Sequence, residues 1–155
     1  MKTKILIIVV FLFTQLSNGQ LKKKYEEIHK LFPNAKSSGL RNEGSSLVED
    51  LEISSEKKKF IVYSKDSIAI GVGNFDKKTI EKETYEKIIS DEIPNFKNSK
   101  SAIVNSKVYY YDEKNNYLII NNPISEQNEF PLKSFFIIIE PKIIEIWIRN
   151  VNSWK

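Results

Sequence analysis

The stretch KFIVYSKDSIAIGVG, residues 59–73, decides the fold class. Two runs rich in β-branched and aromatic residues, 59–64 and 67–73, flank the short turn Lys65–Asp66. Runs of this composition on either side of a short polar turn predict a β-hairpin. The sequence on both sides of the hairpin then indicates which elements pack against it.

The second strand of this hairpin carries only small side chains on one face. Side chains alternate along a strand, so this face holds Ser67, Ala69, Gly71 and Gly73. We favour close packing of the helix that is predicted to follow, because that helix must bury an apolar stripe. The alternative is a ligand groove with Gly71 and Gly73 in its floor, which makes both glycines candidate binding residues.

Amphipathic helices are predicted on both sides of the hairpin. In residues 21–33, apolar side chains recur at spacings of three and four, and Pro33 helps to end the helix. A similar stripe runs through residues 77–93, where Asp76 is the expected N-cap and Pro94 stops the helix. Each helix has one apolar face to bury, so both are expected to pack against the sheet.

Further strands complete the predicted sheet. The segment 47–53 alternates as a strand does, although Ser46 followed by Glu49 also resembles a helix capping box. Residues 34–46 are polar and are predicted to form a long loop. After the second helix we predict four strands, at about 101–111, 117–122, 133–140 and 143–151.

Strands and helices do not alternate regularly in this order, which indicates an α+β fold and not a doubly wound one. We predict one domain, residues 20–155, with a twisted antiparallel sheet of about six strands. Two amphipathic helices are expected to pack against this sheet.

The element order resembles that of PsbP-like domains. The similarity is carried by FIVYSKDSIAIGVG (60–73), TYEKIISDEIPNF (84–96), SAIVNSKVYYYDEKNNYLII (101–120) and the predicted closing hairpin. Those domains place a helix between a strand pair and a further antiparallel run. Their aromatic-rich opening strand has no clear match here, and their helix after the last strand has no room. The resemblance covers residues 60–151 and implies a binding or assembly-factor domain and not an enzyme.

The N-terminus has the pattern of a secretory signal peptide, residues 1–19. A short basic start precedes an apolar run, 5–13, of nine residues. A membrane-spanning helix needs about 20 apolar residues, whereas the central region of a signal peptide needs about 7–15. Ser17 and Gly19 are the small residues of a cleavage site, so we predict a cut between Gly19 and Gln20.

The predicted cut places the mature chain in the periplasm or outside the cell. The chain contains no cysteine, so a lipid-anchored lipoprotein is excluded, and no stable membrane anchor is expected after cleavage. A new N-terminal Gln20 could also cyclise, which would remove the terminal charge. Export and the lack of disulfides together predict a domain that folds on its core alone.

Composition argues against several classes of function. Without the two signal-peptide lysines, 22 basic residues face 20 acidic ones, and nucleic acid is not an expected partner. The absence of cysteine excludes thiol nucleophiles and thiolate zinc sites. The single histidine, His29, is predicted on a helix surface. We therefore predict no catalytic residues, no metal site and no cofactor.

The predicted closing hairpin holds the strongest candidate surface. Pro141 excludes primed two-residue turns, and the remaining turns place Phe136 opposite Trp147, framed by Glu145 and Arg149. The opposite face is wholly apolar and is predicted to be core. Trp and Arg are enriched at binding hot spots, so these four residues are candidate binding residues. For Trp147 itself we favour a structural role under a covering helix, with an interaction surface as the alternative.

These features predict an exported, non-enzymatic binding or interaction protein with an unknown protein or small-molecule ligand. It would bind through the side of the closing hairpin that carries Phe136 and Trp147. One alternative is a small periplasmic hydrolase that uses carboxylates alone, which for a glycosidase needs two acids about 5–9.5 Å apart. Another is an inhibitor or immunity-type protein, which would form a tight stoichiometric complex.

Overall fold

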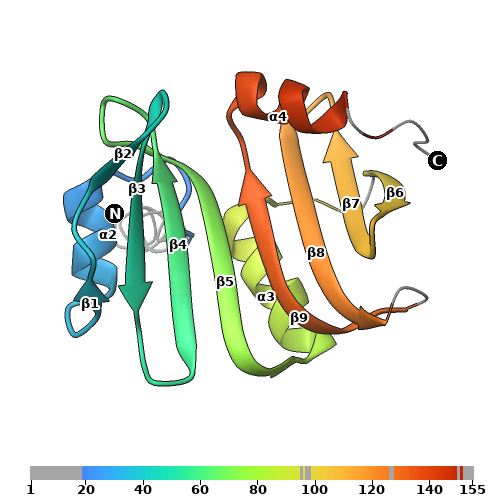
Figure 1. Ribbon diagram of the computed structural model, residues 1–155, viewed down its shortest axis with the longest axis horizontal. Coiled ribbons are helices and arrows are strands. Elements are labelled where there is room, and N and C mark those ends of the chain that lie inside the picture. The colour runs from blue at the N-terminus through green and yellow to red at the C-terminus, as the bar shows by residue number, and fades with distance from the viewer. Residues whose placement is uncertain (1–18, 95, 97–98, 126–127, 150, 152–155) are drawn as a thin grey trace, which may run out of the picture.

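The computed structural model describes residues 19–94, 96, 99–125, 128–149 and 151, and within them nine strands form one sheet (Figure 1). Every pair of neighbouring strands is antiparallel, in the order β1-β3-β4-β5-β9-β8-β7-β6, and β2 also pairs with β3. The strands are β1 (Lys36–Ser37), β2 (Arg41–Glu43), β3 (Ser46–Glu52), β4 (Lys57–Tyr63), β5 (Ala69–Ile80), β6 (Lys100–Val104), β7 (Lys107–Asp112), β8 (Tyr117–Ser125) and β9 (Asn128–Ile138).

Two meanders make up the sheet. Strands β3 to β5 follow one another in space as in sequence, and so do strands β6 to β9. Pairing of β5 with β9, from Gly71 opposite Ile138 to Ile80 opposite Leu132, joins the two meanders at the centre. The predicted hairpin at 59–73 is confirmed as β4 and β5.

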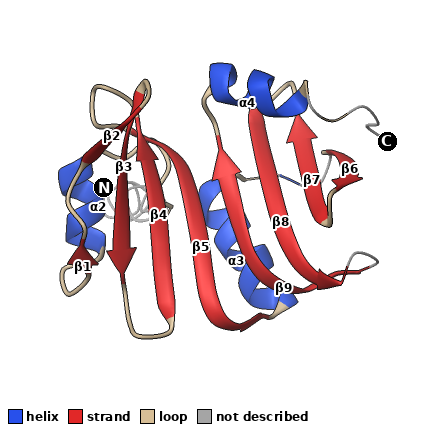
Figure 2. Ribbon diagram, in the orientation of Figure 1, coloured by secondary structure: helices blue, strands red, loops and turns tan. Residues whose placement is uncertain are grey.

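Two helices lie on opposite faces of the second meander. The described helices are α2 (Tyr25–Leu31), α3 (Lys82–Glu92) and α4 (Pro141–Ile148) (Figure 2). Ile89 of α3 packs in a core cluster with Ile137 of β9, whereas Ile144 of α4 packs in another with Ile138. Successive residues of a strand point to opposite faces, so α3 and α4 cover different faces of the sheet.

The first helix, α2, lies on the same face as α3. Its Ile28 is fully buried in a cluster with Ile61 of β4. Ile61 pairs with Val72, and Val72 pairs with Ile137, so the three side chains share one face of the sheet. The face that carries α2 and α3 therefore holds two of the three core clusters.

The prediction of about six strands and two helices is wrong, because the described residues form nine strands and three short helices. Residues 34–46, predicted to be a loop, contain β1 and β2, which pair with β3. The segment 101–111 divides into β6 and β7 at Asn105 and Ser106. Both residues have positive φ, 49° and 62°, as a tight hairpin turn requires.

The start of the second helix was also predicted wrongly. Asp76 is not an N-cap, because β5 continues to Ile80 and α3 begins only at Lys82. Ile80 is buried and pairs with Leu132 of β9, so pairing with a distant strand keeps this segment extended. Local sequence favoured a helix here, and the tertiary pairing overrode that preference.

The predicted closing hairpin is wrong as well, because residues 141–148 form α4. Strand β9 already pairs with β5 on one side and β8 on the other, which leaves no edge for a following strand. Pro141 suits the first position of a helix, where its missing N–H is not needed. Apolar residues then recur with helical spacing at Ile143, Ile144, Trp147 and Ile148. The last strand is thus followed by a helix, for which we expected no room.

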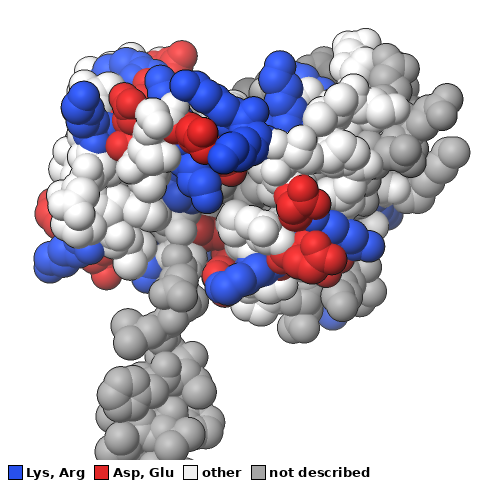
Figure 3. Space-filling model, turned by 90° about the horizontal axis from the view of Figure 1, so that it is seen from below, with Lys and Arg blue, Asp and Glu red and all other residues white. Residues whose placement is uncertain are grey.

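Charged side chains of both signs cover the lower end of the sheet. Figure 3 shows Asp and Glu side chains interspersed among Lys and Arg side chains there. Two of the ion pairs are Lys78 with Glu56, at 3.1 Å, and Lys87 with Asp91, at 3.0 Å. Such exposed pairs contribute about 0–1 kcal/mol each, so the core and not this surface holds the fold together.

Candidate functional site

An aromatic surface lies on the face of the sheet that carries α4. This helix covers the strands of the second meander, and no described helix lies over β3 to β5 on that face (Figure 1). Phe75 of β5 and Trp147 of α4 are exposed by 45% and 36% there. Phe60 of β4 and Phe136 of β9 are half-buried, with ring centroids 6.1 Å apart. We call these four residues the aromatic face.

Two glycines allow the aromatic rings to lie directly on the sheet. A Cβ atom on Gly73 would come within 2.8 Å of Phe75 Cε2 and 2.9 Å of Phe136 Cδ2. On Gly71, it would come within 3.1 Å of Phe136 Cζ. Gly71 and Gly73 of the predicted small-residue row thus accommodate aromatic side chains, whereas Ala69 of that row packs with Ile28 of α2. The interpretation that the following helix packs on this row is wrong.

A small apolar cavity brings three of the predicted site residues together. The cavity has a volume of ≈50 Å³ and lies among Gly71, Phe136 and Trp147. Its remaining lining consists of Val62, Ile70, Ile138 and Ile143, so no titratable side chain lines it. Strand pairing supplies Phe136, and the turn of the chain into α4 brings Trp147 back over the sheet.

The other three predicted residues, Gly73, Glu145 and Arg149, do not line this cavity. Glu145 and Arg149 form an exposed ion pair one helical turn apart on α4. The strand register predicted for them does not exist, and neither side chain lines the cavity. Their charges compensate each other.

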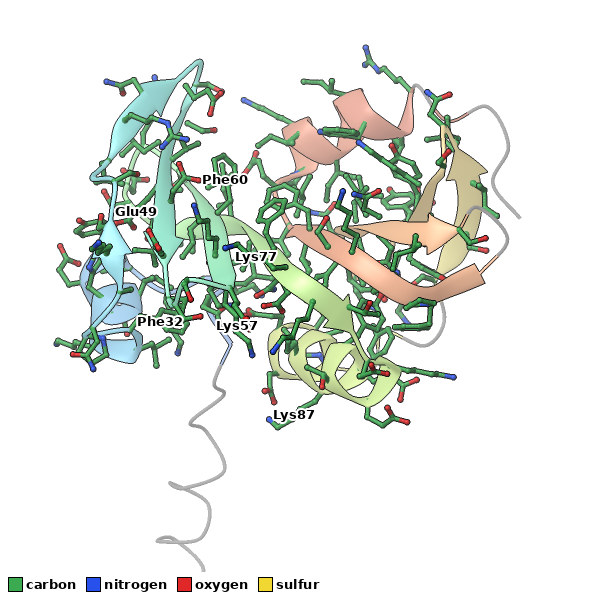
Figure 4. The ribbon with its side chains drawn as sticks, turned by 60° about the horizontal axis from the view of Figure 1, so that its bottom comes forward. Phe32, Glu49, Lys57, Phe60, Lys77 and Lys87 are labelled. Atoms are coloured by element: carbon green, nitrogen blue, oxygen red, sulfur yellow. The ribbon has the colours of Figure 1, made fainter. Side chains whose placement is uncertain are left out.

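Phe60 and Phe75 were not among the predicted site residues. Phe60 pairs with Gly73 across the β4–β5 hairpin, and Phe75 lies two residues further along β5. Alternation along the two strands could have placed both rings beside the glycines. Arg41 lies 5.8 Å from the centroid of the Phe60 ring, and its Nη1 donates to Asp50 Oδ2 at 2.7 Å. The charge of Arg41 beside Phe60 is therefore compensated by Asp50. Figure 4 shows Phe60 among the side chains of the neighbouring strands.

A buried carboxylate lies on the opposite face, under α2. Glu49 accepts hydrogen bonds from Tyr63 Oη, at 2.9 Å, and from Ser37 Oγ, and its Oε1 lies 2.8 Å from His29 Nε2. Burial and the Glu49 carboxylate raise the pKa of Tyr63 far above its ordinary value. Ser37 and His29 both contact the carboxylate, so the geometry differs from a relay in which imidazole activates the hydroxyl. We assign this network a structural role.

A cleft of ≈530 Å³ lies at the C-terminal end of α3 and has three carboxylates in its lining. Glu27 accepts the backbone N–H at the N-cap of α2, and Asp91 pairs with Lys87. Glu92 accepts backbone N–H groups from the segment before α2. Burial raises the pKa of Glu92 despite these donors. Each acid therefore has a structural partner already.

Among the described residues, no group of three or more His, Asp or Glu side chains is placed to hold a metal ion. None of the helices in that part of the chain is long and apolar enough to cross a membrane. Comparisons with protein-family models, with curated proteins and with solved structures found no match to this chain. The resemblance to PsbP-like domains therefore stays a prediction.

Proposed function

We propose that this chain is an exported, non-enzymatic binding protein whose aromatic face contacts a protein partner. The observation that carries the proposal is the apolar cavity beside exposed Trp147. Export rests on the predicted signal peptide, residues 1–19, of which only Gly19 lies within the described residues.

The chemistry of the surface supports an apolar partner segment. Arg41, beside Phe60, pairs with Asp50, so its charge is compensated. A cavity lined by apolar side chains favours an apolar group over water. A small aliphatic side chain of the partner would fit it, with Trp147 packing against the flank of that side chain. Interspersed charges elsewhere (Figure 3) give no reason to expect a polyanion.

The carboxylate-dependent hydrolase is less well supported. Its acids would have to be free to exchange protons with a substrate, yet the carboxylates of the cleft at α3 all bind groups of the chain itself. An inhibitor or immunity-type protein remains compatible with the aromatic face, and a stoichiometric complex with an enzyme would identify it.

The test compares two alanine variants of α4 in capture from the exported fraction of the source cells. Trp147→Ala removes a residue of the aromatic face, whereas Ile146→Ala removes a more exposed side chain that does not line the cavity. A hot-spot truncation costs about 2 kcal/mol or more, which weakens the affinity roughly thirtyfold. We expect the wild type and Ile146→Ala to retain the same partner and Trp147→Ala to lose it.

The retained partner is then titrated against the chain carrying Trp154→Phe, which leaves Trp147 as the single tryptophan. A change in Trp147 fluorescence with saturable binding would support contact at the aromatic face. Equal affinity of all variants would refute this surface as the binding site.

A further inference from the structure

The residues that follow the predicted cleavage point are tied into the fold. Gln20 is only 6% exposed. Just after it, the N–H of Lys22 donates to the carbonyl of Ala69 at 2.8 Å, and the N–H of Ala69 donates to the carbonyl of Lys23 at 2.8 Å. The new N-terminus would therefore be held in place and not extend into solvent.

The backbone nitrogen of Gln20 lies against both oxygens of one carboxylate. It is 2.6 Å from Glu92 Oε1 and 2.7 Å from Glu92 Oε2, and the N–H of Leu21 donates to Oε2 at 2.8 Å. A backbone amide has one hydrogen to share between two oxygens, whereas an ammonium group has three. The geometry suits the ammonium better than the amide.

The surroundings of Glu92 also favour a positive charge. Glu92 is the last residue of α3, and the last turn of that helix contains no basic residue. The C-terminal end of a helix attracts cations, so a carboxylate alone is unfavourable there. Lys59, whose Nζ donates to Gln20 Oε1 at 2.9 Å, is the cation already close enough to attract the Glu92 carboxylate. Burial lowers the pKa of Lys59 to about 8, so it loses its proton more readily than an ordinary lysine.

Gly19 is tightly confined where it precedes Gln20. A Cβ atom there would lie 2.5 Å from the carbonyl oxygen of Asp91 and 3.0 Å from Glu92 Oε2. A residue with a side chain cannot fit at this position without moving the end of α3. Removal of Gly19 by cleavage would leave only the amino group of Gln20 at the carboxylate.

We propose that the Glu92 carboxylate, at the end of α3, is the binding site for the α-ammonium group that cleavage after Gly19 creates on Gln20. This inference rests on the proposed export of the chain. Processing would thus add a charged anchor that the uncut chain lacks, and would tie the N-terminal segment to α3.

The same contact would protect Gln20 from cyclisation. In that reaction the neutral α-amine attacks Cδ of its own side chain, a lactam C–N bond forms and the side-chain nitrogen leaves as ammonia. The ammonium bound to Glu92 has no lone pair with which to attack. The side-chain oxygen of Gln20 accepts a hydrogen bond from Lys59, which further restricts rotation of the side chain towards the amine.

The experiment uses two chains made by site-specific cleavage of a fusion, one beginning at Gln20 and one beginning at Ser17. The described structure begins at Gly19, so both chains keep every described strand and helix. Each chain is made with Glu92, with Glu92→Gln and with the neighbouring charge control Asp91→Asn. Urea midpoints and the loss of ammonia from the intact mass on prolonged warming are measured.

We expect the Gln20 chain to unfold at a higher urea concentration than the Ser17 chain. Glu92→Gln should abolish that difference, and Asp91→Asn should preserve it. Ammonia loss from the Gln20 chain should be roughly tenfold faster in Glu92→Gln, which corresponds to about 1.4 kcal/mol. Should Glu92→Gln fail to fold, the two chains with native Glu92 still provide the comparison of midpoints.

Equal midpoints and equal rates of ammonia loss would overturn the inference. The proposed export is tested separately, by the mass of the protein recovered from cells that express residues 1–155. A mass that begins at Met1 would refute processing without affecting the result for the Glu92 site.

Discussion

Ile144 and Ile146 distinguish a C-terminal helix from a C-terminal strand in a single comparison. In α4, the Ile144 side chain is 2% exposed and packs in the cluster of Leu118 and Ile138, whereas Ile146 is 64% exposed. In a strand, the two side chains would share one face because they are two residues apart. Replacing each by alanine therefore gives a different pattern in the two arrangements.

Ile144→Ala should lower the free energy of unfolding by about 2–3 kcal/mol. Removal of a buried isoleucine to alanine costs about 2–5 kcal/mol. We expect the lower part of that range because α4 has only eight residues and can shift towards the space. Ile146→Ala should change stability by no more than about 0.5 kcal/mol, since its side chain is exposed and alanine is a better helix former.

Urea unfolding followed by far-ultraviolet circular dichroism measures both effects. A domain of this size loses about 1–3 kcal/mol of stability per molar urea, so Ile144→Ala should move the midpoint by about 1 M and Ile146→Ala should not move it. Similar losses in both variants would indicate a strand. The cavity at the aromatic face would then be lost as well, because Trp147 reaches it only from a helix.

Two further predictions concern the buried polar groups. Tyr63→Phe removes a hydrogen bond to the buried Glu49 carboxylate and should cost about 1.5–3 kcal/mol in urea unfolding; an unchanged midpoint would show that water replaces the hydroxyl. Lys59 has a pKa of about 8 in the folded chain and about 10.4 when unfolded, so the unfolded chain binds more protons between these values. The wild type should therefore gain stability relative to Lys59→Met from pH 8 to pH 10, by about 2 kcal/mol. A stability difference between the two proteins that stays constant from pH 8 to pH 10 would argue against a lowered pKa of Lys59.

The sequence identified the elements that local pattern determines. The β4–β5 hairpin depends on two strand-like runs and a short turn, and α2 depends on an apolar stripe that Pro33 follows. The predictions failed where pairing between strands far apart in the sequence determines the local structure. Nothing near Asp76 reveals that Leu132 will pair with Ile80. The isoleucines of 143–148 favour a strand by composition, whereas Pro141 and the spacing of the apolar residues favour a helix. The pairing of β9 on both sides decides between the two.

The candidate site was found in part for reasons that the structure does not support. Phe136 and Trp147 meet, but a helix above the sheet brings them together and not the predicted strand register. Gly71 joins them because the same face of β5 lies next to β9. The contact of Gln20 with Glu92 joins residues 72 positions apart, and no spacing in the sequence indicates it.

The central pairing of β5 with β9 has a consequence for the order of folding. Contacts between distant segments form slowly, because a long loop must close first. The first meander can assemble as soon as residue 80 is available, but its β5 edge stays open until β9, which ends at Ile138, arrives. An open edge rich in β-branched residues is a site for association between chains. The arrival of the last strand therefore determines how long this edge stays unpaired.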